Sequence, residues 1–343
     1  MTGHRQALKD TAREMVAAGQ GILAADESNA TMTKRLEAVG VESSPDSRRD
    51  FRELLVTTPG AGEHISAVIL YDETLRQTSS DGTPFPELLA RLGMIPGIKV
   101  DTGAKPLACA PGETVTEGLD GLRERLDEYR GLGARFAKWR AVIAVDAERP
   151  SRRAVAVNAH ALARYAALCQ EAGIVPIVEP EVLMDGGHDI ARSQELTGDT
   201  LRAVFAELVD QGVALEGIVL KPNMVLAGYD CPEQPEVEEV AQRTLELLRQ
   251  VVPAAVPGIA FLSGGQSDEL ASARLSAINA IGGAPWQLSF SYGRALQATA
   301  LAQWSGEDCR AAGAQSVFAH RARCNGQARN GHYTPDMERS LVA

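Results

Sequence analysis

The segment FAKWRAVIAV, residues Phe136–Val145, is a run of apolar and β-branched residues in which Lys138 and Arg140 are the only charges. Such a run is typical of a strand that is buried on both faces in a parallel sheet. Seven further runs of this kind occur along the chain, and most are followed by a helical pattern. The eight expected strands are Gly21–Asp26, Ile65–Tyr71, Gly97–Asp101, Phe136–Val145, Ile174–Pro180, Gly217–Lys221, Gly258–Leu262 and Trp286–Ser291.

The segments between these runs carry helix signals at their ends. Ser151 is placed to cap an alanine-rich helix that ends at Gly173, and Ser267 precedes a helix with acidic residues in its first turn. Apolar stripes with helical spacing predict three more helices, over Leu119–Tyr129, from Thr200 to Gly212, and over Val237–Val251.

Eight strand–helix units with continuously apolar strands predict an α/β fold, a single (β/α)8 TIM barrel, and not two domains. We expect one domain over residues 1–343, with an N-terminal helical extension and a short C-terminal tail. Pro176 conflicts with a regular strand, because proline cannot donate to the ladder. We therefore expect it at the first residue of its strand or at an irregularity.

Composition and charge exclude several classes of partner. Hydrophobic residues make up 45% and charged residues 23% of the 343, as in ordinary soluble globular proteins. The net charge of −11 disfavours nucleic acid and anionic membrane surfaces as partners. The five cysteines form no C-x-x-C pair, and the N-terminal residues lack the apolar core of a signal peptide. We expect a cytoplasmic protein without disulfides or a membrane span.

Ionisable residues gather where the apolar runs end, which in a barrel of this type is the face that carries the active site. They are Asp26, Lys99, Asp101, Lys138, Arg140, Glu179, Glu181 and Lys221. Any one of them could be a solvent-facing charge or part of a structural ion pair. A buried charge without a partner costs several kcal/mol. The whole set at equivalent positions therefore predicts charges that compensate one another around a ligand.

The residue types narrow the chemistry. The six histidines form no H-x-H or H-E-x-x-H pair, and His188 is interpreted as a loop histidine, so no metal is expected. The G-x-S-x-G, G-x-x-x-x-G-K-[ST] and G-x-G-x-x-G motifs are absent, and no cofactor is expected. An enclosed lysine amine beside another cation can form a Schiff base with a carbonyl. Lys221, with Lys138 across the barrel, fits this description.

Glycine-rich turns follow the last two strands, in Ser263-Gly264-Gly265 and Ser291-Tyr292-Gly293-Arg294. Barrels often bind phosphate in these loops, where backbone N–H groups and helix N-termini favour an anion. A Gly-Gly pair alone is often only a tight turn, but together with Arg294 it predicts a phosphate site. A second basic set, comprising Lys99, Arg140 and the pair Lys34-Arg35, could bind another phosphate across the mouth. That pair alone is also typical of a solvated helix face.

Seven motifs occur in order between Gly21 and Trp304: GILAADES, GIKVD, FAKWR, IVPIVEPE, LKPNM, FLSGGQS and SFSYGRALQ. Together they closely resemble class I fructose-bisphosphate aldolases. The resemblance implies a (β/α)8 barrel, a homotetramer, and catalysis through a lysine imine without a metal. It also implies reversible cleavage of fructose 1,6-bisphosphate to glycerone phosphate and glyceraldehyde 3-phosphate, in glycolysis and gluconeogenesis.

The resemblance also implies roles for individual residues. Lys221 matches the Schiff-base lysine, Glu179 the general acid and base, and Asp26 the carboxylate at the C4 hydroxyl. Lys138 matches the lysine that orients Glu179 and the substrate, and Glu181 joins these catalytic candidates. The C1 phosphate pocket is matched by Ser263, Gly264, Gly265, Ser291 and Arg294, with Gly293 beside them. The C6 phosphate ligands are matched by Ser28, Arg35 and Lys99, with Arg140 nearby.

The chain departs from the family in two places. Asn29-Ala30-Thr31 stands where relatives often have Thr-Gly-Ser, and we expect the Thr31 hydroxyl to preserve binding of the C6 phosphate. Animal members end in a longer tail with a terminal tyrosine that assists proton transfer. Here the last tyrosine is Tyr333. We expect slower protonation of the enamine, or another group or water in that role.

Two other interpretations stay open at this point. One is a Schiff-base aldolase with a different sugar-phosphate preference, which the relative turnover of fructose 1,6-bisphosphate, fructose 1-phosphate and tagatose 1,6-bisphosphate would distinguish. The other is a non-catalytic binding or scaffolding role for the same barrel, which would require a damaged site.

Overall fold

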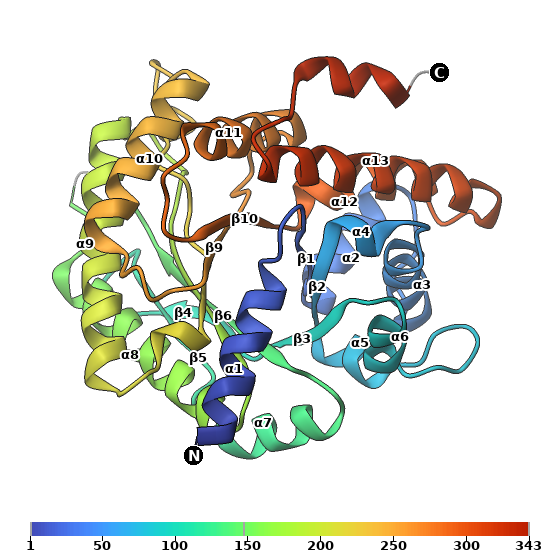
Figure 1. Cartoon of the computed structure of the whole chain (residues 1–343), viewed down its shortest axis with the longest axis horizontal. Coiled ribbons are helices and arrows are strands. Elements are labelled where there is room, and N and C mark those ends of the chain that lie inside the picture. The colour runs from blue at the N-terminus through green and yellow to red at the C-terminus, as the bar shows by residue number, and fades with distance from the viewer. Residues whose placement is uncertain (1, 147, 342–343) are drawn as a thin grey trace.

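Eight parallel strands form a closed barrel in the order β1-β10-β9-β8-β7-β6-β3-β2, and helices surround it (Figure 1). The computed structural model describes residues 2–146 and 148–341. The barrel strands are β1 (Gly21–Ala25), β2 (Ile65–Leu70), β3 (Ile95–Lys99), β6 (Phe136–Ile143), β7 (Val175–Val182), β8 (Val219–Leu220), β9 (Gly258–Phe261) and β10 (Gln287–Tyr292). All eight predicted strands are present, and the prediction of a (β/α)8 barrel is confirmed.

The helices alternate with these strands and extend the barrel at both chain ends. They are α1 (Thr2–Met15), α2 (Asn29–Ala38), α3 (Pro45–Val56), α4 (Ala61–His64), α5 (Asp72–Arg76), α6 (Phe85–Arg91), α7 (Leu122–Gly131), α8 (Arg152–Glu171), α9 (Ile190–Asp210), α10 (Val237–Val251), α11 (Asp268–Ile281), α12 (Arg294–Trp304) and α13 (Ala311–Arg329). Short 3₁₀ helices span Leu215–Gly217, Asp308–Arg310 and Pro335–Leu341.

The helix caps follow the sequence signals in two cases and not in a third. The hydroxyls of Ser151 and Ser267 accept hydrogen bonds from the first turns of α8 and α11, as predicted. The start predicted at Thr200 is wrong, because α9 begins ten residues earlier at Ile190. The carboxylate of Asp189 accepts a 2.7 Å hydrogen bond from the backbone of Arg192 and caps this longer helix.

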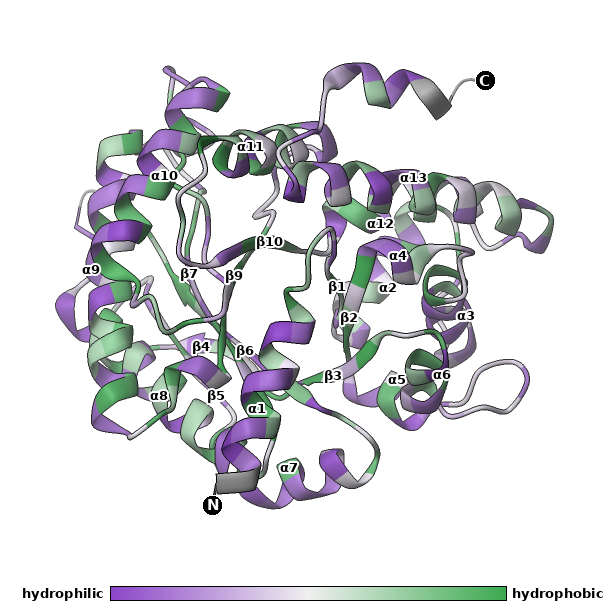
Figure 2. Ribbon diagram, in the orientation of Figure 1, coloured by the Kyte–Doolittle hydropathy of each residue, from purple (hydrophilic) through white to green (hydrophobic). Residues whose placement is uncertain are grey.

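The N-terminal end of the barrel is filled by apolar side chains. Leu8, Ala12, Met15 and Val16, on α1 and just after it, pack against the inward-facing residues of the strands. Helix α1 lies across this end of the barrel in Figure 1. Figure 2 shows mainly hydrophobic strands inside helices whose outer surfaces are largely hydrophilic. With this end closed, the carboxyl ends of the strands are left to form a site.

Pro176 is the second residue of β7, not the first, and it keeps a regular register opposite Ala137 of β6. The backbone N–H of the preceding Val175 points toward β6, where it donates to the carbonyl of Arg135. The nitrogen of Pro176 therefore faces the β8 side. Pairing with β8 begins only at Ile177, so no ladder hydrogen bond is lost at the proline.

An antiparallel hairpin of β4 (Gly103–Pro106) and β5 (Thr114–Glu117) follows β3 and is absent from the predicted elements. The hydroxyl of Thr116 donates to the carbonyl of Arg140 at 2.7 Å, and the side chain of Asn158 accepts from the backbone of Thr116 at 3.2 Å. These contacts hold the hairpin against β6 and α8, beside the mouth of the barrel.

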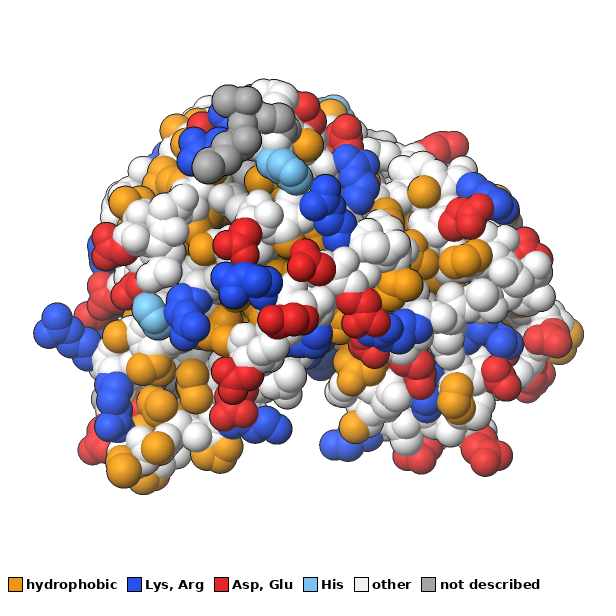
Figure 3. All heavy atoms as spheres, turned by 90° about the horizontal axis from the view of Figure 1, so that it is seen from below, with side chains coloured by type: hydrophobic (Ala, Val, Ile, Leu, Met, Phe, Trp, Pro, Cys, Tyr) orange, Lys and Arg blue, Asp and Glu red, His pale blue; other side chains and the backbone are white. Residues whose placement is uncertain are grey.

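Acidic and basic side chains are interspersed over the face shown in Figure 3, without a broad patch of one sign. This mixture agrees with a moderate net charge of −11 over the 343 residues. None of the helices in the described part of the chain combines the length and the apolar composition needed to cross a membrane.

Candidate active site

The alternation of side chains along the strands turns the strand-end charges into the barrel. An inward-facing apolar layer lines the barrel below the site. Four residues of this layer are each followed two positions later by a charged residue: Ala24 by Asp26, Phe136 by Lys138, Ile177 by Glu179, and Val219 by Lys221. The same alternation that builds the core therefore delivers the polar site directly above it.

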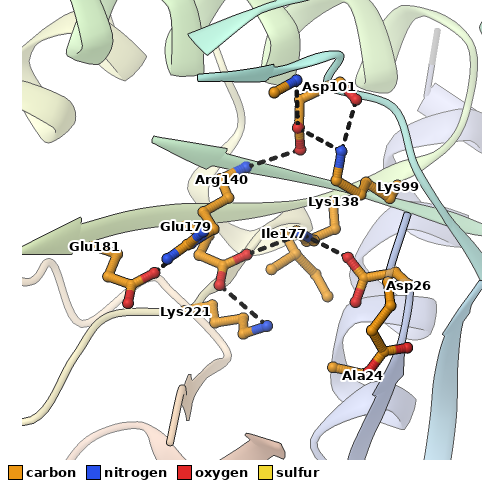
Figure 4. A network of polar contacts seen from close by, with 12 residues as sticks. Ala24, Asp26, Lys99, Asp101, Lys138, Arg140, Ile177, Glu179, Glu181 and Lys221 are labelled. Carbon is orange, nitrogen blue, oxygen red and sulfur yellow. Dashed lines mark hydrogen bonds and ion pairs between the residues drawn. The ribbon is translucent and has the colours of Figure 1, made fainter. Parts of the chain in front are cut away.

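Two buried lysines share one buried carboxylate at the centre of this site (Figure 4). The Nζ atom of Lys221 lies 3.2 Å from Oε1 of Glu179, and the Nζ atom of Lys138 lies 3.4 Å from Oε2. Lys138 also forms a 2.6 Å ion pair with Oδ2 of Asp26. Two ammonium groups and two carboxylates thus compensate one another, as the sequence predicts for buried charges.

The electrostatics of Asp26 and Lys138 keep both groups charged. Burial alone would raise the pKa of Asp26, but attraction by Lys138 and Lys221 outweighs it and lowers the pKa from 3.8 to about 2. Burial alone would lower the pKa of Lys138, but Asp26 and Glu179 raise it well above its usual range. Asp26 is a carboxylate at neutral pH, and Lys138 is a fixed cation.

Three further cations of the site are each paired with a carboxylate. Lys99 donates to Oδ1 of Asp101 at 2.6 Å and to its carbonyl at 2.8 Å. Arg140 forms an ion pair with Glu181 and Arg35 one with Glu27. Burial would lower the pKa of Arg140, but Glu181 holds it above the usual range. All the cations from β3, β6 and α2 that face the cavity have a protein counter-ion.

The loop after β9 differs from the paired charges of the strand ends because it is formed by glycines. Gly264 and Gly265 adopt φ angles of +59° and +100°, which favour glycine. A Cβ atom on Gly264 would lie 1.8 Å from the Cε atom of Met184, so this position has no room for a side chain. The hydroxyl of Ser291, in β10, is buried without a hydrogen-bond partner.

Arg294 opens α12 beside this loop, and a Cβ atom on Gly265 would lie 3.3 Å from its guanidinium. Arg294 is exposed and has no carboxylate oxygen within 4.0 Å among the residues that the structure describes. This end of the site combines an unpaired cation with an unsatisfied hydroxyl, and both are suited to an anion.

A cavity of about 450 Å³ opens at the carboxyl ends of the strands. All the predicted site residues line it except Gly265: Asp26, Ser28, Arg35, Lys99, Lys138, Arg140, Glu179, Glu181, Lys221, Ser263, Gly264, Ser291, Gly293 and Arg294. Gly265 lies one residue beyond the lining, beside Arg294. Lys34 is exposed and does not line the cavity, in line with the interpretation of a solvated helix face.

Several lining residues had no predicted role. Asp101 was one of the strand-end charges expected around the ligand but had no individual role, and it accepts hydrogen bonds from the backbone of Gly103 and Arg140. Glu27 lies beside Arg35, a contact that only the packing of α2 against the strands creates. Thr102, Gly103 and Ala104 line the cavity from the hairpin, and no sequence signal pointed to them.

The structure shows where the two departures from the family pattern lie, at Asn29-Ala30-Thr31 and at Tyr333. The hydroxyl of Ser28 caps α2 and lies 3.1 Å from that of Thr31, which also lines the cavity. Tyr333 is buried outside the cavity, and its hydroxyl donates to Glu338 at 2.8 Å.

The histidines lie outside the cavity. His188 is in the loop before α9, as predicted. Among the described residues, the one histidine, cysteine and carboxylate group close enough to share a cation is His320, Cys324 and Glu338, near the C-terminus. None of these three lines the cavity.

The chain is similar to known proteins over nearly its whole length. Residues 7–342 match the family described as fructose-bisphosphate aldolase class-I. A probable fructose-bisphosphate aldolase class 1 of Xanthomonas campestris is 55% identical over 327 residues, covering 95% of this chain and 98% of that protein. Fructose-bisphosphate aldolase B of Gallus gallus is 50% identical, covering 99% and 94%.

The solved structures agree with this result. Fructose-bisphosphate aldolase of Plasmodium falciparum, in complex with TRAP and a small-molecule inhibitor, has a TM-score of 0.96 and 46% identity, covering 97% of both chains. The chain therefore belongs to the class I fructose-bisphosphate aldolase family, whose members cleave fructose 1,6-bisphosphate reversibly to glycerone phosphate and D-glyceraldehyde 3-phosphate through a lysine Schiff base, without a metal ion.

Proposed function

We propose that Lys221 is the lysine that forms the Schiff base with the C2 carbonyl of fructose 1,6-bisphosphate. This assignment rests on the different carboxylate contacts of the two buried lysines. Lys138 is held as a cation between two carboxylates, whereas Lys221 contacts only one oxygen of Glu179. Lys221 is therefore the amine that can lose a proton and attack a carbonyl.

Glu179 is the group that moves protons at this amine. Its Oε1 lies 3.2 Å from Lys221, and its Oε2 has no hydrogen-bond partner. It can accept a proton from the attacking amine and return it to the C2 hydroxyl of the carbinolamine, which leaves as water. Lys138, 3.4 Å from Oε2, orients this carboxylate.

Asp26 is the base for carbon–carbon cleavage. Its carboxylate accepts the proton of the C4 hydroxyl, and the electrons of the C3–C4 bond pass to the protonated imine, giving an enamine and glyceraldehyde 3-phosphate. Protonation of the enamine at C3 and hydrolysis of the imine then release glycerone phosphate and free the amine. A pKa of about 2 supplies Asp26 in the carboxylate form that this step requires.

The two phosphates hold the substrate across the mouth of the barrel. We assign the C1 phosphate to Ser263, Gly264, Gly265, Ser291, Gly293 and Arg294, where the unpaired guanidinium and the unsatisfied hydroxyl lie. We assign the C6 phosphate to Ser28, Arg35 and Lys99, with Arg140 and its partner Glu181 beside them. Fixing both ends holds the reacting C3–C4 bond near Asp26.

We also propose that residues 1–343 form one domain and that the enzyme is a cytoplasmic homotetramer. The family resemblance supports the tetramer. The absence of disulfides among the five cysteines, all of which the structure describes, supports a reducing compartment. Light scattering coupled to size-exclusion chromatography tests the assembly directly.

The assignment of Glu179 is tested by the conservative variant Glu179→Gln. We expect imine formation with glycerone phosphate to slow by about a hundredfold or more, because proton transfer at the amine is lost. Rapid-quench trapping measures this rate. An unchanged rate would show that another group carries the proton.

A further inference from the structure

The helix behind the 263–266 loop carries a buried cation that has no counter-ion. Arg274, on α11, is 6% exposed. No carboxylate oxygen lies within 4.0 Å of its guanidinium among the described residues. It donates one hydrogen bond, from Nη1 to the side-chain oxygen of Gln266 at 2.9 Å, and its Nε is buried without a partner.

Two other buried arginines are paired with a carboxylate. Arg48 forms two hydrogen bonds with Glu73, and Arg321 is paired with Glu338. Arg329 also lacks a carboxylate and has a buried Nε without a partner, but its Nη2 donates to the carbonyl of Val16 at 2.9 Å and to Gln287 at 2.6 Å, so it makes more hydrogen bonds than Arg274. Burying a cation without a counter-ion costs free energy of folding. An anion bound near Arg274 would reduce this cost, and the protein itself does not provide one.

Arg274 is connected to the 263–266 loop through Gln266. Because the guanidinium takes the oxygen of the Gln266 amide, the amide nitrogen points the other way and donates to the carbonyl of Ser263 at 3.1 Å. The backbone N–H of Gln266 donates to the same carbonyl at 3.0 Å. These contacts close the loop around Gly264 and Gly265.

The side chain of Tyr229 also contacts the same loop. The hydroxyl of Tyr229 donates to the carbonyl of Gly264 at 3.0 Å. Burial raises the pKa of this tyrosine, and Arg274 and Arg294 act in the opposite direction. Both guanidinium groups therefore lie close enough to act on the side chain that is hydrogen-bonded to Gly264.

We propose that Arg274 is a positioning residue for the 263–266 loop, and that the substrate phosphate bound there is the anion that compensates its buried charge. Arg274 acts in two ways: through Gln266 it holds the loop in its binding conformation, and its charge adds to that of Arg294. This inference rests on the proposed binding of the C1 phosphate to this loop.

The test compares Arg274→Met with Arg329→Met, which removes an equally buried guanidinium, 6% exposed, on α13 and outside the cavity. Inorganic phosphate is used as a competitive inhibitor against fructose 1,6-bisphosphate. We expect Arg274→Met to raise the KM and the inhibition constant of phosphate about tenfold and to change kcat less than about threefold. Arg329→Met should change thermal stability but neither binding constant. The inference would be overturned if the two variants changed the inhibition constant of phosphate equally, or if Arg274→Met did not change it.

A second variant keeps the test available if Arg274→Met does not fold. Gln266→Glu has nearly the same shape, supplies the counter-ion that Arg274 lacks, and cannot donate to Ser263. We expect it to weaken phosphate binding about tenfold. Phosphate binding as tight as in the unmodified enzyme would contradict both parts of the proposal.

Arg294→Met separates this inference from the site assignment on which it rests. If it leaves phosphate inhibition unchanged, the assignment of the C1 phosphate is wrong, and the role of Arg274 falls with it. If Arg294→Met weakens phosphate binding and Arg274→Met does not, only the proposed role of Arg274 is wrong.

Discussion

The ammonium of Lys138 lies 2.6 Å from the carboxylate of Asp26, and the two side chains are only 4% and 12% exposed. The pairing fixes the charge of both groups: it lowers the pKa of Asp26 to about 2 and raises that of Lys138. It also removes Lys138 from the set of available nucleophiles. The pair therefore accounts for the different roles that we propose for the two neighbouring buried lysines.

Removing the ammonium in Lys138→Met should shift the acid limb of the pH profile of kcat. Asp26 acts as a carboxylate, and its lowered pKa keeps it ionised at any pH well above 2. Without Lys138, burial raises this pKa, so protonated Asp26 accumulates at higher pH and activity is lost earlier on acidification. We expect the acid limb to move upward by about one pH unit or more.

The matched control for this variant is Lys9→Met, which removes a half-exposed lysine paired with Glu216 at 3.1 Å on the closed side of the barrel. Its pH profile should match that of the unmodified enzyme. An acid limb that stays in place in Lys138→Met would contradict the proposed role of the pair.

Arg35→Met should discriminate between substrates with one and two phosphates. Arg35 lines the part of the cavity assigned to the C6 phosphate. We expect the KM of fructose 1,6-bisphosphate to rise about tenfold and that of fructose 1-phosphate to change less than about twofold, because a charge-assisted hydrogen bond to phosphate is lost. Steady-state kinetics with both ketoses measure the effect.

Arg294→Met provides the comparison, because both substrates carry the C1 phosphate. It should raise both KM values by about the same factor. If Arg35→Met raises the KM of both substrates by the same factor, the assignment of the two phosphate ends is wrong.

The central residues of the site could be predicted from the sequence because their positions follow a local rule. Lys138 and Glu179 each stand two positions after an inward-facing apolar residue of the same strand, and Lys221 follows Val219 in the same way. Once the runs are recognised as barrel strands, alternation and strand direction bring these side chains together. No long-range contact has to be known in advance.

The remainder of the site depends on contacts between distant segments. The pairing of Arg35 with Glu27 arises where α2 folds back on the end of β1. The β4–β5 hairpin is short and mostly solvent-facing, so its residues show no apolar alternation. The early start of α9 follows from packing: Asn223 donates to Thr197 at 3.1 Å and so holds the first half of the helix over the strand ends.

Gly264→Ala should weaken binding at the loop after β9. The added methyl group would meet Met184 at 1.8 Å, and the φ angle of +59° disfavours any residue with a Cβ atom. We expect the KM of fructose 1,6-bisphosphate to rise roughly tenfold as the loop shifts. The double variant Gly264→Ala with Met184→Ala should recover part of the loss, since it removes the clash. A KM unaffected by Gly264→Ala would argue against close packing of this loop.

Removal of divalent metal ions should leave activity unchanged. The central carboxylates of the cavity are compensated by the amines of Lys138 and Lys221, and the electron sink is an imine. We expect the rate of fructose 1,6-bisphosphate cleavage to be the same before and after dialysis against EDTA. A loss of activity that zinc restores would contradict the metal-independent mechanism.

Formation of the imine on Lys221 is tested by mass spectrometry of the borohydride-reduced glycerone phosphate adduct. We expect one stable adduct per active site, located on the peptide that contains Lys221, together with irreversible loss of activity. Lys221→Met should form no adduct and show no cleavage, whereas Lys9→Met should be trapped like the unmodified enzyme. An adduct on Lys138, or full activity after reduction in the presence of glycerone phosphate, would contradict it.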